Sequence, residues 1–247
     1  ERAIRPYYQP IVELGTDKIG GFEALARWHH ATMGEVAPER FMPVAEACGL
    51  MSELGDHLLR TACRDACSWP ANTTLAFNVS PVQLRNPTFG LRVMAILGET
   101  GLAPSRLELE ITENTLVRDL KIADEVLGSL RAAGVRVALD DFGTGYSSLY
   151  HLKKFKFDRI KIDRSFVESM VEESQSATIV RALLGLGHGL GVSITAEGIE
   201  RGAQKDALVG EGCDHGQGFL FSRAMSASDA AALFEDAGRP AGHSLQA

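Results

Sequence analysis

The sequence has no long apolar segment, no cluster of basic residues and few cysteines. No run approaches the roughly eighteen apolar residues of a membrane-spanning helix, and the N-terminus does not resemble a secretion signal. The net charge of −7 argues against general binding to DNA, RNA or an anionic membrane surface. We therefore expect a soluble protein without a membrane segment. A few local cations could still hold a single anionic substrate.

The four cysteines, Cys48, Cys63, Cys67 and Cys213, form no C-x-x-C pair. Cys63 and Cys67 would share one face of a helix, where ordinary packing is a simpler explanation than a metal site or a disulfide. This use of cysteine fits a reducing compartment, so we expect a cytoplasmic protein.

The length of 247 residues and the hydrophobic content of 45% are sufficient for one large core. We expect a single domain over residues 1–235 and a flexible tail over residues 236–247. Glu1 is not an initiator methionine, and a strand pattern begins almost at once. We therefore expect the sequence to be a piece of a longer protein.

Short β-branched runs alternate with longer helical patterns along the chain. The predicted strands cover residues 7–13, 18–27, 74–79, 106–111, 135–140, 158–162, 192–196 and 216–221, and the clearest helices cover 52–69, 115–133 and 174–190. Only a few residues join the first two strands, too few for a parallel crossover. We predict an α/β fold, a modified TIM (β/α)8 barrel with an antiparallel first strand. An open doubly wound sheet is the alternative.

Polar residues recur on one face of these strands, near their C-terminal ends. Leu109 and Ile111, for example, leave Glu110 on the opposite face of its strand. The residues brought to one end of the barrel in this way are Glu23, Asn78, Glu110, Asp140, Lys161, Asp163 and Glu197. Barrels of this type have their active sites at that end. Oxygen ligands without a histidine cluster suit Mg²⁺ or Mn²⁺ better than Zn²⁺.

Each of these residues also has an ordinary structural explanation. The alternatives are a surface strand position for Glu23, a turn for Asn78, helix-start acids for Glu110 and Glu113, a solvated charge for Lys161, and an acidic turn for Asp140 and Asp141. We prefer the active-site interpretation because chance does not align charged positions at the ends of six strands.

A signature motif and seven further ordered motifs, which together cover nearly the whole chain, resemble those of EAL-domain cyclic di-GMP phosphodiesterases. The signature is Glu23-Ala24-Leu25-Ala26-Arg27-Trp28. The others are Tyr8-Gln9-Pro10-Ile11-Val12, Phe77-Asn78-Val79-Ser80, Leu109-Glu110-Ile111-Thr112-Glu113, the Asp140-to-Leu149 loop, Lys161-Ile162-Asp163-Arg164-Ser165-Phe166, Ala196-Glu197-Gly198-Ile199-Glu200 and Gln217-Gly218-Phe219-Leu220-Phe221. The family fold is a barrel with an antiparallel first strand, in agreement with the loop-length argument.

The resemblance implies two metal sites. The residues that resemble ligands of one ion are Glu23, Asn78, Glu110 and Asp140; those of the second are Asp140 and Asp141, with Glu197 nearby and acting partly through water. The implied cofactor is Mg²⁺ or Mn²⁺, two ions, and Ca²⁺ is expected to inhibit. Such a pair of ions lowers the pKa of a shared water in phosphodiester hydrolysis.

The resemblance also implies catalytic and substrate-binding residues. The catalytic set is Lys161, Glu197 and Glu23. Lys161 resembles the lysine that orients or deprotonates the attacking water, and the alternative is that it neutralises the phosphate. Arg27 suits a substrate phosphate, because its guanidinium can donate to two oxygens. The residues that resemble the lining of a dinucleotide groove are Gln9, Leu25, Glu200 and Gln217.

Glu113 lies three residues beyond Glu110, past the end of the strand. It could be an acid at the start of a helix, where the helix dipole favours it by roughly 0.3–1 kcal/mol. The resemblance implies instead that it anchors the loop from Phe142 to Ser148, which carries the glycines next to Asp141.

The implied function is metal-dependent hydrolysis of cyclic di-GMP to linear pGpG, which lowers a second messenger of bacterial signalling. The implied assembly is a homodimer, with sensory or GGDEF-type domains in the full-length protein. One alternative is a catalytically weak EAL module that acts as a cyclic di-GMP receptor; another is an unrelated Mg²⁺-dependent barrel enzyme of the enolase type. Departures from the family pattern at Thr195, Phe219 and Ala224 remove no ligand.

Overall fold

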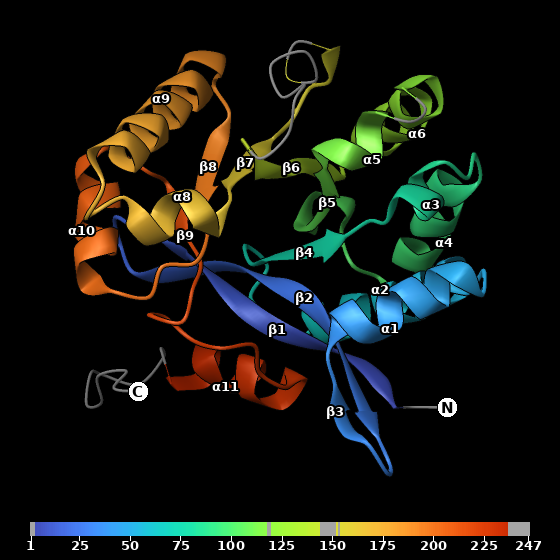
Figure 1. The fold of residues 1–247 in the computed structure, drawn as a ribbon. Coiled ribbons are helices and arrows are strands. Elements are labelled where there is room, and N and C mark those ends of the chain that lie inside the picture. The colour runs from blue at the N-terminus through green and yellow to red at the C-terminus, as the bar shows by residue number, and fades with distance from the viewer. Residues whose placement is uncertain (1–2, 118–119, 144–151, 153, 237–247) are drawn as a thin grey trace.

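The structure, a computed structural model, describes residues 3–117, 120–143, 152 and 154–236. Its strands form one sheet in the order β1-β9-β8-β7-β6-β5-β4-β2-β3, and β1 also pairs with β2, so the sheet closes on itself (Figure 1). The strands are β1 (Ile4–Glu13), β2 (Lys18–His30), β3 (Gly34–Val36), β4 (Thr74–Asn78), β5 (Leu107–Thr112), β6 (Arg136–Phe142), β7 (Arg159–Ile162), β8 (Ser193–Ala196) and β9 (His215–Gly216). Closure excludes the open doubly wound sheet.

Helices surround this barrel (Figure 1). They are α1 (Pro38–Ala47), α2 (Met51–Ala66), α3 (Pro81–Leu84), α4 (Phe89–Thr100), α5 (Glu113–Val117), α6 (Leu120–Ala132), α8 (Arg164–Ser169), α9 (Ser174–Leu190), α10 (Gly202–Gly210) and α11 (Ala227–Asp236), with a 3₁₀ turn at Pro104–Arg106. None of the helices in the described ranges is long and apolar enough to cross a membrane.

The first two strands form the predicted antiparallel hairpin. Glu13 pairs with Lys18, and the turn between them is closed by the Asp17 N–H, which donates to the Glu13 carbonyl at 2.9 Å. Asp17 has a φ of 57°, a left-handed conformation that aspartate tolerates better than most residues. β1 is also antiparallel to β9. Apart from the short β3, which is antiparallel to β2, the other strand pairs of the sheet are parallel. β1 is therefore the reversed strand.

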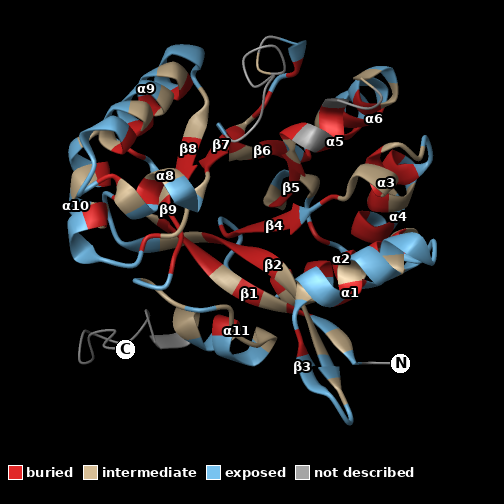
Figure 2. Cartoon of the chain, viewed as in Figure 1, coloured by how far each residue is buried: buried red, intermediate tan, exposed pale blue. Residues whose placement is uncertain are grey.

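The apolar core lies between the outer face of the barrel and the helices (Figure 2). Leu107, Leu109 and Ile111 alternate along β5 and are completely buried there. On the facing helices, buried positions recur at helical spacing, as at Val180, Leu184 and Gly187 of α9. This division leaves the other face of each strand for the barrel interior, where the polar residues lie.

Two expected elements differ from the structure. The predicted strand 216–221 is only His215–Gly216, because the chain turns after Gln217: the N–H groups of Phe221 and Ser222 both donate to the Gly218 carbonyl. The predicted helix 115–133 consists of two described helices, α5 and α6. The expected tail lies outside the described residues, except for Asp236, which ends α11.

A buried ion pair crosses the inside of the barrel. Arg159 of β7 donates from Nε to Glu108 Oε1 of β5 at 2.8 Å and from Nη1 to Thr195 Oγ1 of β8 at 2.9 Å. β6, which lies between β5 and β7, presents only the small Ala138 at this level. All three polar side chains are buried, so the pair closes the barrel interior below its carboxyl end. The hydrogen bond to Arg159 also accounts for a threonine at position 195.

We expect Glu108→Ala to lower the free energy of unfolding by about 3–5 kcal/mol, because it leaves the Arg159 guanidinium buried without its counter-ion. Urea unfolding would measure this change. The matched control is Glu172→Ala, which removes an exposed ion pair with Arg201 and should cost less than about 1 kcal/mol. Similar losses in the two variants would contradict the role given to the buried pair.

Candidate active site at the carboxyl end of the barrel

Lys161 stands at the centre of a ring of carboxylates. Its Nζ atom lies 2.7 Å from Glu197 Oε1, 2.9 Å from Glu110 Oε2, 3.4 Å from Glu23 Oε2 and 3.6 Å from Asp140 Oδ1. These residues come from β2, β5, β6, β7 and the end of β8, strands that are not all neighbours. Such contacts are possible only across the barrel interior. We call Glu23, Asn78, Glu110, Asp140, Asp141 and Glu197 the acidic ring, and Lys161 lies at its centre.

Adjacent carboxylates reach the ring through a bulge in β6. Leu139 pairs with Ile160 and Phe142 with Ile162, so Asp140 and Asp141 together face the single residue Lys161. A regular strand would point successive side chains to opposite faces, but a bulge removes this restriction. Asp141 has a φ of 54°, and its N–H donates to Asp140 Oδ1 at 2.9 Å. Both carboxylates can therefore serve the same end of the barrel.

Hydrogen bonds fix the carboxylate of Glu23. Oε1 accepts from Asn78 Nδ2 at 2.6 Å, and Oε2 accepts from Gln217 Nε2 at 2.7 Å. Because the Asn78 nitrogen is used in this way, its Oδ1 atom is the one left for another ligand. Asn78 itself is exposed at the end of β4.

Burial and mutual repulsion shift the acidity of the ring. Burial raises the pKa of Glu197 to about 8, with the charge of Asp140 adding to the effect, and burial raises the pKa of Glu110 well above its ordinary value.

Burial also favours a higher pKa for Glu23, but Lys161 and the amides of Gln217 and Asn78 outweigh it and lower this pKa. Burial would lower the pKa of Lys161, but the surrounding carboxylates raise it well above its usual range.

These shifts describe a site with an excess of negative charge. Four carboxylates surround one ammonium. Glu110 Oε1 is buried without a hydrogen-bond donor among the described residues, and Oε2 has the Lys161 ammonium as its counter-ion. Oxygens of Asp140, Asp141 and Glu197 lie within 4.8 Å of one another. A hard divalent cation would satisfy both the charge and the open oxygens. The residues present therefore fit a metal ion.

Asp163 follows Lys161 by two residues and was expected on the same side of the strand. It caps α8 instead, where Oδ1 accepts from the Ser165 N–H at 3.0 Å. Asp163 makes no ion pair with Lys161 among the described residues. It stays at this end of the barrel, where burial, Asp140 and Asp163 raise the pKa of Asp141.

Some of the predicted substrate-binding residues contact the acidic ring and others lie outside it. Gln9 and Gln217 are hydrogen-bonded to each other at 3.2 Å and reach the ring through Glu23. Leu25 and Arg27 follow Glu23 at alternate positions of β2 and are half-buried, and the Arg27 guanidinium lies 3.8 Å from Glu35. Glu200 is exposed just beyond the segment that carries Glu197. Leu25, Arg27 and Glu200 thus lie outside the contacts of the ring.

Glu113 lies at the first position of α5 and is buried. Its Oε1 atom accepts a hydrogen bond from the Gly143 N–H at 3.3 Å, two residues after Asp141. Residues 144–148 of the expected loop lie outside the described residues. The contact that the structure describes joins Glu113 to the start of the segment it was expected to anchor.

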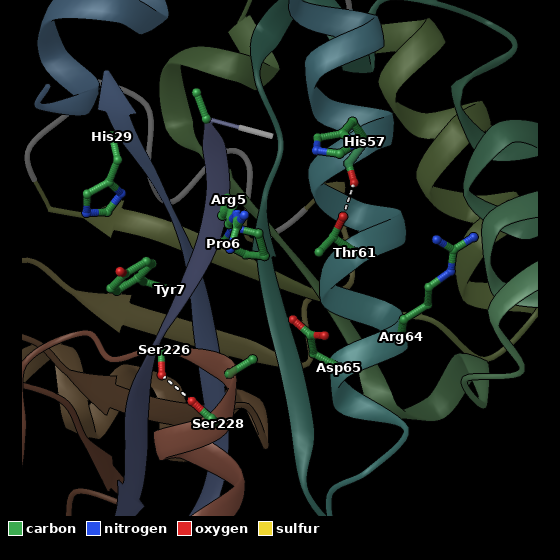
Figure 3. A pocket seen from close by; sticks show the side chains of 12 residues that line it. Arg5, Pro6, Tyr7, His29, His57, Thr61, Arg64, Asp65, Ser226 and Ser228 are labelled. Carbon is green, nitrogen blue, oxygen red and sulfur yellow. Dashed lines mark hydrogen bonds between the residues drawn. The ribbon is translucent and has the colours of Figure 1, made fainter. Parts of the chain in front are cut away.

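A separate cavity of about 900 Å³ lies beside the first half of β1 (Figure 3). His29 and Tyr7 line one side of it, with their rings stacked at 5.6 Å, and His57, Thr61 and Asp65 of α2 line the other. No residue of the acidic ring lines this cavity. This cavity is therefore not the candidate site. The candidate site is the place where the ionisable side chains of the acidic ring converge.

The pair Glu108 and Arg159 was missed in the sequence, although a signal was present. Glu108 precedes Glu110 by two residues, and Arg159 precedes Lys161 by two, so strand alternation places each pair on one face. The hydrogen bond from Gln217 to Glu23 joins residues 194 positions apart and has no local signal.

The reversed first strand and the ring around a buried lysine define a modified TIM barrel with an acidic site suited to divalent cations. The family model of the EAL domain matches residues 1–224, and the chain belongs to this family.

Relatives and solved structures agree with this assignment. The chain is 47% identical over 234 residues to an uncharacterized signaling protein of Caulobacter vibrioides, covering 95% of this chain and 29% of that protein. It is 40% identical over 225 residues to MucR of Pseudomonas aeruginosa, named a bifunctional diguanylate cyclase/cyclic di-GMP phosphodiesterase, covering 90% of this chain and 33% of MucR. The chain thus spans about a third or less of these relatives.

Two solved structures are similar over nearly the full chain. The PaMucR phosphodiesterase in complex with c-di-GMP has a TM-score of 0.88 and 39% identity, covering 93% of this chain and 94% of that one. The EAL domain of Mycobacterium smegmatis DcpA has a TM-score of 0.82 and 36% identity, covering 96% and 100%.

We expect divalent cations to stabilise the fold. At a Mn²⁺ concentration of 100 times Kd the gain is about 2.7 kcal/mol, or a rise of roughly 5–10 °C in Tm for a domain of this size. Glu110→Gln should abolish most of that rise, because it removes a proposed ligand oxygen. Without cations it should not lower Tm, because it removes one of several carboxylates that repel one another. Differential scanning fluorimetry would measure both. The exposed Glu125→Gln is the control, and a Mn²⁺ response in Glu110→Gln equal to that of the unchanged protein would contradict the prediction.

Proposed function

We propose that this domain hydrolyses cyclic di-GMP to linear pGpG in a reaction that requires Mg²⁺ or Mn²⁺. The observation that carries the proposal is the acidic ring around Lys161, with more buried negative charge than one ammonium can balance. Similarity to the PaMucR phosphodiesterase, solved with c-di-GMP, supports the choice of substrate. In the reaction water adds to phosphorus and the bond from phosphorus to O3′ breaks, which leaves a 5′-phosphate and a 3′-hydroxyl.

The ring residues divide between two proposed cation sites. The proposed ligands of one ion are Glu23, Asn78, Glu110 and Asp140, and those of the other are Asp140, Asp141 and Glu197. A bound pair of cations would lower the pKa of the attacking water and offset charge on the attacking and leaving oxygens. The fixed orientation of Glu23 and Asn78 prepares oxygen ligands before any ion arrives.

Lys161 presents its N–H groups at the centre of the ring. From there it orients the attacking water and offsets the negative charge that develops on the phosphate. Arg27 lies farther out on the same face of β2, and its guanidinium suits a phosphate of the substrate. We include a homodimer in the proposal. We also include further domains in the full-length protein, which the greater length of the relatives supports.

The decisive experiment is incubation of the purified chain with cyclic di-GMP and Mg²⁺, with chromatographic detection of pGpG. We expect EDTA to abolish turnover, Mg²⁺ or Mn²⁺ to restore it, and Ca²⁺ to inhibit it, because Ca²⁺ accepts longer and looser coordination. Full activity in excess EDTA would contradict the metal requirement. Binding of cyclic di-GMP without pGpG formation would establish the receptor alternative.

We expect Lys161→Met to lower kcat by on the order of 10²-fold or more while cation affinity is retained, because the substitution keeps the side-chain volume and removes the charge. Steady-state kinetics and Mn²⁺ titration would measure the two effects. Lys121→Met, at an exposed position of α6, is the matched control. Normal turnover of Lys161→Met would refute the catalytic assignment.

We expect Glu113→Ala to remain folded but to lose most activity and to bind Mg²⁺ more weakly, because the Gly143 N–H loses its acceptor and the segment after Asp141 loses its anchor. Glu113→Gln keeps an acceptor oxygen and should retain more activity. Circular dichroism, kinetics and Mg²⁺ titration would test this, with Glu125→Ala as the control. Near-normal kinetics and metal affinity would return Glu113 to the role of a helix-start acid.

A further inference from the structure

Gln217 joins a chain of hydrogen bonds that ends on Glu23. Its side chain is buried directly after β9, and its Nε2 atom donates to Glu23 Oε2 at 2.7 Å and to Gln9 Oε1 at 3.2 Å. Gln9 in turn donates from Nε2 to the Ser222 carbonyl at 3.1 Å. The described donor contacts of Gln217 thus point to the acidic ring and to Gln9, which is unexpected for a residue that only lines a substrate groove.

The backbone around Gln217 is held firmly. The Gln217 N–H donates to the Ala196 carbonyl at 2.9 Å, and the Gln217 carbonyl accepts from the Ile199 N–H at 3.0 Å. A Cβ atom added at Gly218 would lie 2.1 Å from the Ile199 carbonyl oxygen. The segment after β9 and the segment after β8 are therefore packed too closely for any residue other than glycine at position 218. The amide of Gln217 is therefore presented from a segment that is fixed against the one carrying Glu197.

The orientation of the amide follows from its partner. A carboxylate only accepts hydrogen bonds, so the nitrogen of Gln217 must face Glu23. The Oε1 atom of Gln217 is then buried with no hydrogen-bond donor among the described residues. An unsatisfied buried acceptor beside the ring indicates that a ligand or its water supplies a donor there.

The bond also limits how Glu23 meets Lys161. Oε2 of Glu23 lies 2.7 Å from Gln217 but 3.4 Å from Lys161 Nζ, so the amide is the closer partner. Without the amide the carboxylate would be free to turn toward the ammonium and form a closer ion pair. Such a pair would compete with a cation for the same oxygen.

We propose that Gln217, braced by Gln9, is a positioning residue that holds the Glu23 carboxylate in the orientation required for cation binding. The inference rests on the proposed function, because it assigns a supporting residue to the proposed metal site. It gives the two glutamines a role in cation affinity, separate from any contact with the dinucleotide.

The test is Gln217→Met in the otherwise unchanged chain, a substitution that keeps the length of the side chain and removes both hydrogen bonds. Calorimetric titration with MnCl₂ and no substrate should show an affinity roughly 10–100-fold weaker than that of the unchanged protein. Activity at low Mn²⁺ should fall and should recover with excess Mn²⁺, with little change in KM. Arg27→Met is the comparison: it should raise KM and leave Mn²⁺ affinity unchanged.

Gln9 provides a second, independent variant. Gln9→Met should weaken Mn²⁺ binding by less than about tenfold, because it acts only through Gln217. The double variant should lose no more affinity than Gln217→Met alone, since both changes break one chain of contacts. If Gln217→Met fails to fold, Gln9→Met decides, and unchanged Mn²⁺ affinity in a folded Gln9→Met would overturn the proposal.

The outcomes separate this inference from the function beneath it. Unchanged Mn²⁺ affinity with a raised KM in Gln217→Met would make Gln217 a substrate contact and overturn the inference alone. Strictly additive losses in the double variant would also overturn it. Absence of both Mn²⁺ binding and pGpG formation in the unchanged protein would instead refute the proposed function.

Discussion

The ion pairs between Lys161 and four carboxylates are the interaction on which the site depends. The ammonium lies 2.7–3.6 Å from oxygens supplied by four other segments of the barrel. Without the ammonium the buried carboxylates would have no counter-ion among the described residues, which is costly. The cluster therefore constrains the register and closure of the strands, as well as the chemistry at their ends.

The barrel interior contains two polar levels with different electrostatic character. At the lower level Arg159 is hydrogen-bonded to Glu108 and to Thr195, and the charges of Arg159 and Glu108 cancel. The level of Lys161 has excess negative charge and an open oxygen on Glu110. The difference explains how the same alternation of residues along β5 and β7 supports stability at one level and ligand binding at the next.

Much of this arrangement could be predicted from the sequence because it follows from local rules. Strand alternation placed Glu110 and Lys161 on the interior face, and the short connection before Lys18 required an antiparallel hairpin. The bulge at Asp141 could not be predicted, because it depends on the register of β6 against β7. The contact between Gln217 and Glu23 depends on closure of the whole barrel, which brings together residues distant in the chain.

The buried Arg159–Glu108 pair limits the direction from which a ligand can reach the acidic ring. These side chains are buried beneath the ring, so in the part of the chain that the structure describes they close the barrel interior on the side away from the carboxyl ends of the strands. A ligand of Lys161 therefore enters at the carboxyl end of the strands and leaves at the same end. Because entry and exit share this route, a ligand that leaves slowly blocks the approach of the next one.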